Sequence, residues 1–193
     1  AWPGGPKVDV VFQKFKEYHC PVWIAGGFVR DHFADQPHKD VDIAVLCGGN
    51  IVQPVLRALG SPSTDSGHFI FSEGLFEGFQ VTLFTLEKPP EYSATMLFLS
   101  VAHGMVVDPM GCGIEDAKAK TLRPAMLEYY QVAGRWAQWM EGDLLGAEDE
   151  TTKMRLKRYS KMIGREWQPF NHAFGEFMKA EEGRAGGNSA TRD

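Results

Sequence analysis

The sequence predicts a domain of mixed strands and helices, of the α/β or α+β class, followed by a smaller helical segment. Short apolar runs beside glycines predict strands, and apolar residues at helical spacing predict the helices between them. With 193 residues, 44% of them hydrophobic, the chain is long enough for one substantial core and an appendage. Because strand and helix patterns alternate in the first 90 residues, both kinds of element are expected in one sheet domain.

The elements follow one another closely along the first half of the chain. In order, we expect a helix at 8–18, a strand at 22–25 ending in two glycines, a helix at 28–34, a strand at 41–46, a helix at 52–59, and two strands around Gly74 and Gly78. From Glu91 to about Lys179 the pattern predicts helices, interrupted by a segment rich in glycine and proline at 106–124. The polar, glycine-rich residues 181–193 predict a disordered tail.

Composition restricts the classes of partner. The net charge of −5 disfavours broad attraction to a polyanion, so any contact with nucleic acid requires a local basic surface. Since no apolar run approaches the roughly 20 residues that span a bilayer and the first residues do not resemble a secretory signal, we expect a cytoplasmic protein without a membrane partner. The widely spaced Cys20, Cys47 and Cys112 are expected as buried free thiols, with neither a disulfide frame nor a zinc site.

Two carboxylates stand two residues apart in the block AGGFVRDHFADQPHKDVDIAV, residues 25–45. On the expected strand, the side chains of Asp40 and Asp42 point to the same face. Such a pair is costly unless cations neutralise it, and hard oxygen ligands suit Mg2+, which also binds nucleotide phosphates. The pair therefore predicts a site for metal-assisted phosphoryl transfer, with Asp40 and Asp42 as the metal ligands and catalytic residues.

A phosphate site is predicted next to these carboxylates. Gly26 and Gly27 lie between a strand and a helix, where the missing side chains let backbone N–H groups approach phosphate oxygens. Arg30, in the first turns of that helix, is placed to clamp a triphosphate. An ordinary glycine turn and a solvated acidic pair are the alternatives for each motif taken alone.

In combination, GGxVRD followed at short distance by DxD resembles the signature of the head domain shared by tRNA CCA-adding enzymes and bacterial poly(A) polymerases, in the polymerase-beta-like nucleotidyltransferase superfamily. The resemblance implies an α+β nucleotidyltransferase head at 1–124 with a mixed sheet, and a helical, neck-like nucleotide-reading segment at 125–180. It implies a structural or orienting role for Asp31. The segment 106–124 resembles the family segment that closes the head, whose role is chiefly structural.

Residues 148–162 resemble the family helix that reads the incoming base. The resemblance implies base-reading roles for Glu148, Asp149, Arg155 and Arg158. Helical spacing places Thr152, Leu156, Tyr159 and Ile163 on one stripe, and the opposite lysines, with Arg165, are candidate RNA contacts: Lys153, Lys157 and Lys161. An amphipathic helix with a solvated basic face is the alternative. Trp136, Trp139 and Trp167 are candidates for base stacking or for packing.

Three departures from the family leave parts of the function open. Gln80 occupies the position where a family strand commonly carries an acidic residue, so a third carboxylate ligand is in doubt. The arginines and aspartate of the sugar-contacting motif are absent near residues 93–103, so ribose selectivity is not inherited. Thr152 stands where an arginine usually completes the base-reading set, which leaves the choice between CTP and ATP open.

The resulting hypothesis is an Mg2+-dependent nucleotidyltransferase that moves NMP from an NTP to an acceptor hydroxyl, with an RNA 3′ end as the expected acceptor. Family members are much longer, so substrate capture is expected to be smaller or supplied by a protein partner. Transfer to a protein or small molecule is one alternative. A catalytically silent nucleotide- or RNA-binding module is the other, favoured by Gln80 and the missing sugar motif.

Overall fold

The computed structural model describes residues 5–38, 40–65, 68–83, 92–100, 102–125, 140 and 150–187. Within these ranges the chain forms an α+β fold with a seven-stranded mixed sheet of order β3-β4-β5-β2-β1-β6-β7. The strands are β1 (Val22–Ala25), β2 (Val41–Val45), β3 (Ser63–Asp65), β4 (His68–Ile70), β5 (Phe79–Leu83), β6 (Phe98–Ser100) and β7 (Met105–Val107). The predicted α+β class and mixed sheet are confirmed.

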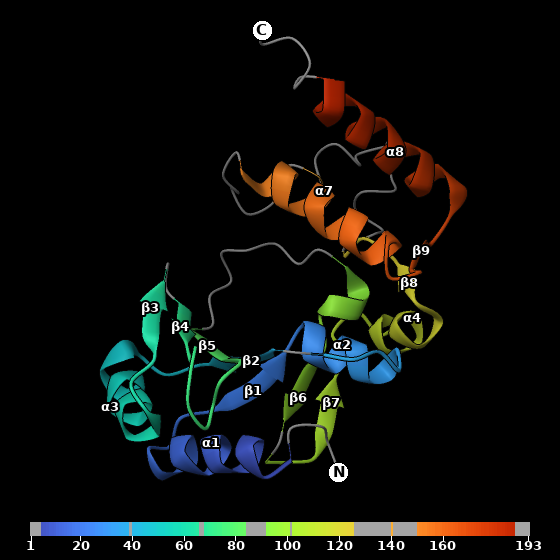
Figure 1. Ribbon diagram of the computed structural model, residues 1–193. Helices are drawn as coiled ribbons and strands as arrows, with labels where there is room; N and C mark the ends of the chain where they lie inside the picture. The colour runs from blue at the N-terminus through green and yellow to red at the C-terminus, as the bar shows by residue number, and fades with distance from the viewer. Residues whose placement is uncertain are drawn as a thin grey trace, which may run out of the picture.

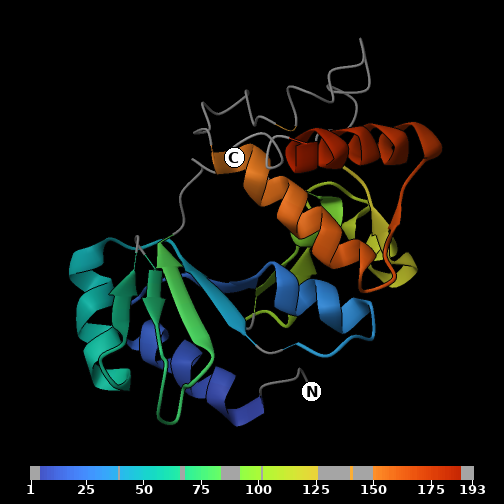
Figure 2. The same ribbon diagram turned by 45° about the horizontal axis from the view of Figure 1, so that its top comes forward.

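Helices pack on both sides of this sheet (Figure 1). Helices α1 (Gly5–Glu17) and α3 (Gly49–Leu59) contact each other beneath it, whereas α2 (Gly27–Phe33) packs against α4 (Gly113–Ala119) and the 3₁₀ helix η1 (Ser93–Thr95). Beyond them lie α7 (Glu150–Ile163) and α8 (His172–Gly187), which pack against each other. In Figure 2, α7 descends so that its C-terminal end lies beside α2.

The sheet has one apolar face and one mixed face. Register pairs Ile24 with Ile43 and Ile43 with Val81, so these side chains share a face, and all three are fully buried. Asp42 alternates with them and therefore belongs to the opposite face, where its register neighbours are Ala25 and Gln80. The apolar face forms the core, and the mixed face remains available for chemistry.

The second half of the chain returns to the head through a short parallel pair. Strand β8 (Thr121–Leu122) pairs with β9 (Gln168–Pro169), which follows α7. The predicted segment boundary at residue 124 therefore falls just after a strand that is paired with residues more than 40 positions later, since Thr121 is paired with Gln168.

Several elements differ from the sequence-based expectation. The pattern after Glu91 predicts helices, but β6 and β7 are strands of the sheet; their three-residue lengths are too short for alternation to reveal. Strand β3 was not predicted either. The tail was expected to be disordered from residue 181, yet α8 continues to Gly187, because its apolar residues Phe174 and Met178 are fully buried and anchor the helix. Residues 188–193 lie outside the described ranges.

The expectation of three free thiols is wrong for two of them. Cys20 and Cys47 form a disulfide, with Cα atoms 5.5 Å apart, and Cys112 is free. The register explains the pairing: Val22 lies opposite Val45, so the residues just outside this pair approach each other across the two strands. Cysteine spacing along the chain carries no sign of that contact. Among the described helices, none combines the length and the hydrophobicity that a membrane span requires.

Candidate active site

Asp42 lies at the centre of the sheet, on the mixed face. Its strand β2 runs antiparallel to β1 and parallel to β5, which places Ala25 on one side of Asp42 and Gln80 on the other. Asp40 comes directly before β2 and is exposed, whereas Asp42 is partly buried. Asp40 therefore precedes the strand on which we expected it, but the two carboxylates still interact electrostatically.

The glycine turn between β1 and α2 lies beside the carboxylate of Asp42. Gly26, with a φ of 68°, connects β1 to α2, and a Cβ atom built on it would lie 4.0 Å from Oδ2 of Asp42. This backbone conformation favours glycine, because L side chains are strained there. The predicted strand, glycine turn, helix and second strand are thus brought together, and the turn lies against Asp42.

Arg30 lies over the second glycine. A Cβ atom on Gly27 would be 3.2 Å from Nη2 and 3.6 Å from Cζ of Arg30, so the absent side chain makes room for the guanidinium group. The structure therefore brings together Gly26, Gly27, Arg30 and Asp42, four of the residues that the sequence assigned to the metal and phosphate sites.

The charge environment of Asp42 is mixed. Burial raises the pKa of Asp42 above its ordinary value, and repulsion from Asp40 raises it further. The positive charges of Arg158, His68 and Arg30 act in the opposite direction. A cation that binds both carboxylates would therefore stabilise the ionised form of Asp42, because it offsets their mutual repulsion.

Helix α7 contributes Arg158 to this environment. Arg158 is exposed and acts electrostatically on Asp42, whereas Arg155, the other predicted base-reading arginine, is only 1% exposed. Glu148 and Asp149 lie outside the described residues. The candidate RNA contacts Lys153, Lys157 and Lys161 are all exposed.

The buried face of α7 differs from the predicted stripe. Arg155, Tyr159 and Met162 are buried, at i, i+4 and i+7, and Ile163 is 38% exposed. The sequence pattern failed here because a buried arginine reads as a polar position. Trp167 is fully buried, which favours its packing interpretation, while Trp136 and Trp139 lie outside the described residues.

The segment 106–124 holds its shape through two aspartates. Asp108 accepts hydrogen bonds from the backbone N–H groups of Gly113 (3.1 Å) and Ile114 (3.1 Å) at the start of α4. Asp116, which is buried, accepts from the Ser93 hydroxyl (2.5 Å) and from Nε of Arg123 (2.8 Å). Both contacts lie within the head, as expected for a structural segment.

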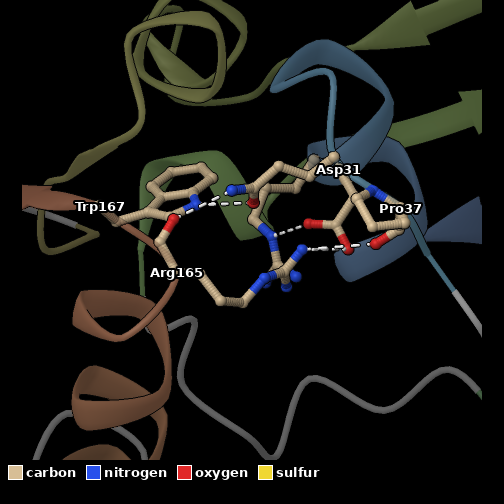
Figure 3. Close-up of polar contacts among 6 residues, drawn as sticks. Asp31, Pro37, Arg165 and Trp167 are labelled. Carbon is tan, nitrogen blue, oxygen red and sulfur yellow. Dashed lines mark hydrogen bonds and ion pairs between the residues drawn. The ribbon is translucent and has the colours of Figure 1, made fainter.

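The sequence did not predict the contacts by which Arg165 and Trp167, after α7, bind Asp31 and Gln36 of the head. Nη2 of Arg165 lies 3.3 Å from Oδ2 of Asp31, so this expected RNA contact faces the head (Figure 3). Gln36 accepts a hydrogen bond from Nε1 of Trp167 at 2.9 Å. A sequence signal was available only for Asp31, as the last residue of GGFVRD.

Solved structures of much longer proteins share the fold of this chain. The Thermotoga maritima CCA-adding enzyme complexed with tRNA matches with a TM-score of 0.54 and 16% identity, over 83% of this chain and 44% of its own. The Bacillus stearothermophilus CCA-adding enzyme in complex with CTP matches with a TM-score of 0.52 and 18% identity, over 80% of this chain and 43% of its own. The chain has the fold of the CCA-adding enzymes.

A structure of a tRNA-processing enzyme in an apo form also matches this chain, with a TM-score of 0.50 and 19% identity over 82% of this chain. Comparison of the sequence with protein-family models and with curated proteins gives no match. This chain covers at most half the length of these three proteins. The predicted resemblance is therefore confirmed at the level of the fold.

Proposed function

We propose that this protein is a metal-dependent nucleotidyltransferase that transfers NMP from an NTP to an acceptor hydroxyl, and that the acceptor is a tRNA-like RNA 3′ end. The observation that carries the proposal is the position of Asp42. It lies beside the glycine turn, within electrostatic reach of Asp40 and of the cations Arg30 and Arg158. The complexes of CCA-adding enzymes with CTP, ATP and tRNA support an NTP and an RNA as substrates.

The residues present fit a divalent ion that arrives with its nucleotide. Among the described residues, no group of three or more His, Cys, Asp or Glu side chains is placed to hold a metal. Mg2+ commonly binds through one or two carboxylates and completes its octahedron with phosphate oxygens and water. Asp40 and Asp42 would supply the carboxylates, and the mutual repulsion that raises the pKa of Asp42 would be relieved.

In the proposed reaction, the acceptor hydroxyl loses its proton to water and its oxygen forms a bond to the α-phosphorus, while the bond from that phosphorus to the bridging oxygen breaks and pyrophosphate leaves. Bound Mg2+ would lower the pKa of the attacking hydroxyl and neutralise charge on the phosphates. Asp40 and Asp42 orient the reacting groups, and Arg30 binds the triphosphate next to Gly27. Arg158 adds positive charge from α7, while Lys153, Lys157 and Lys161 contact RNA phosphates.

The base-reading assignment now divides between the two arginines. Arg158 remains a candidate contact to the incoming base because it is exposed on the helix that reaches Asp42. Arg155 is buried, so it would support the neighbouring residues of α7 rather than contact the base directly. Glu148 and Asp149 keep the role that the resemblance implies.

The test is to incubate the full chain with each labelled NTP and Mg2+, together with either RNA or a protein extract. Label on RNA 3′ ends supports the proposal, and label on protein would assign the chemistry to a different acceptor. Asp42→Asn should abolish incorporation while the protein stays folded, whereas Asp9→Asn, an exposed aspartate of α1, should leave it unchanged. Undiminished incorporation by Asp42→Asn would overturn the catalytic assignment.

A further inference from the structure

A buried carboxylate joins helix α2 to the segment that directly follows α7. Asp31, which is 5% exposed, accepts a hydrogen bond from Nε of Arg30 (2.8 Å) on Oδ1. Its other oxygen, Oδ2, forms an ion pair with Nη2 of Arg165 at 3.3 Å. Figure 3 shows Asp31 reached by the guanidinium group of Arg165. One side chain of the head thus binds two arginines that are 135 positions apart in the sequence (165 − 30).

Hydrogen bonds fix the second arginine from several sides. Nη2 of Arg165 also donates to the carbonyl oxygen of Pro37 (3.4 Å), and the carbonyl oxygen of Arg165 accepts from Nε2 of Gln36 (3.0 Å). Gln36 uses its own oxygen to accept from Nε1 of Trp167 at 2.9 Å. Such a network limits the rotamers of every member. Arg165 and Trp167 are therefore docked on the segment that follows α2.

The same residues surround the guanidinium group of Arg30. Its Nε is bound by Asp31, and its Cζ lies 5.9 Å from the centroid of the Trp167 ring, within the range of a cation–π contact. Its two remaining nitrogens lie close to Gly27, because a Cβ on that residue would be 3.2 Å from Nη2 and 3.8 Å from Nη1. Arg30 is thus held on one edge and near one face, with its two terminal nitrogens close to Gly27.

The charges of this cluster do not cancel. One carboxylate, Asp31, faces two guanidinium groups, so the cluster has a net charge of +1. Arg165 binds Asp31 and the Pro37 carbonyl, and Nη1 and Nη2 of Arg30 lie near Gly27. The excess positive charge is therefore presented at the place where the proposed triphosphate would bind.

We propose that Arg165 is a positioning residue for phosphate binding, acting through Asp31 and Arg30. This inference rests on the proposed function, since it assigns the ligand as the β- and γ-phosphates of an NTP. An arginine that is already ordered loses less conformational entropy when it binds phosphate. Loss of this ordering should therefore weaken triphosphate binding roughly two- to twelvefold, because immobilising such a side chain costs about 0.5–1.5 kcal/mol. Contacts to the base and ribose should be unaffected.

The experiment measures affinity rather than turnover, by calorimetry on the full chain with Mg2+ and ATP, AMP or tripolyphosphate. Arg165→Gln should weaken ATP and tripolyphosphate while leaving AMP unchanged. Arg184→Gln is the matched control, because Arg184 is also ion-paired, to Glu181, but its side chain is 75% exposed on α8 rather than 24% exposed as in Arg165. Thermal unfolding of each variant confirms that the protein remains folded.

A second arm separates positioning from direct contact. In an Arg30→Gln background, Arg165→Gln should cause no further loss of ATP affinity, since Arg165 acts through Arg30. Additive losses of ATP affinity would overturn the inference, because Arg165 would then bind phosphate itself. Equal weakening of ATP and AMP binding by Arg165→Gln would overturn it as well. Wild-type protein that binds neither ATP nor tripolyphosphate would overturn the proposed function together with this inference, whereas ATP binding insensitive to Arg165→Gln would overturn the inference alone.

Discussion

Gly113 is the position where one added methyl group should do the most damage to the head. It starts α4, and a Cβ atom built on it would lie 2.5 Å from the carbonyl oxygen of Ser93, 2.8 Å from Oδ1 of Asp108 and 2.9 Å from Cδ2 of Leu97. Real Cβ atoms essentially never approach other atoms below 3.0 Å. Because all three neighbours surround the same point, Gly113→Ala requires the start of α4 to move away from η1.

The magnitude follows from what that movement breaks. Overpacking a well-packed site costs about 1–3 kcal/mol. Asp108 accepts from the N–H groups of Gly113 and Ile114, and loss of such a cap adds about 1 kcal/mol. The sum of about 2–4 kcal/mol should lower the midpoint of thermal unfolding by roughly 4–16 °C for a chain of this size.

The assay is thermal and urea unfolding of Gly113→Ala, followed by circular dichroism, with Gly183→Ala as the matched control. Gly183 lies inside α8, and a Cβ atom added to it would meet nothing within 4 Å, so the same methyl group should stabilise the protein by about 0.5–1 kcal/mol. The two variants should therefore move in opposite directions. If the free energy of unfolding of Gly113→Ala lies within about 0.5 kcal/mol of the wild-type value, the packing described for the 106–124 segment is refuted.

Three further predictions concern the site and the disulfide. Asp42→Asn removes a partly buried charge that Asp40 repels, so in EDTA the variant should unfold at a higher temperature than the wild type. The variant should also lose the stabilisation that Mg2+ with ATP gives the wild type. If Mg2+ and ATP stabilise both proteins equally, the metal assignment is contradicted. Gln80→Glu places a third carboxylate beside Asp42 in register, so nucleotide transfer should require a lower Mg2+ concentration. The metal-free variant should lose about 0.5–1 kcal/mol of stability, because like charges then lie side by side. An unchanged Mg2+ dependence would speak against position 80 as the place of the missing carboxylate ligand. The Cys20–Cys47 bond spans 27 residues, so reduction should cost about 3–4 kcal/mol by the loop-entropy model, and a reducing agent should lower the unfolding midpoint of the wild type but not of Cys47→Ser.

The sequence predicted those features that depend on neighbouring residues. The glycine turn, the strand that carries Asp42 and the first helices are local patterns, and they appear where expected, with β1 at Val22–Ala25 and β2 at Val41–Val45. Strand β5 at Phe79–Leu83 also lies in the region where the sequence predicts a strand. These elements determine the fold and place the proposed carboxylate pair.

The features that the sequence did not predict are contacts between distant segments. The ion pair of Asp31 with Arg165 joins residues 134 positions apart (165 − 31), and neither residue type indicates the partner. The disulfide of Cys20 and Cys47 depends in the same way on the antiparallel register of β1 and β2. Strands β6 and β7 were hidden because a three-residue strand has no period to detect.

The short β8–β9 pair bears on how the chain can be divided. A fragment ending at residue 124 would lose the partner of Thr121 and Leu122 and leave an open strand edge at its own end. It would also lose the indole that Gln36 binds, uncovering the apolar surface against which that fully buried ring packs. Such a fragment should therefore aggregate, and the smallest soluble unit should include the returning strand and the tryptophan that precedes it.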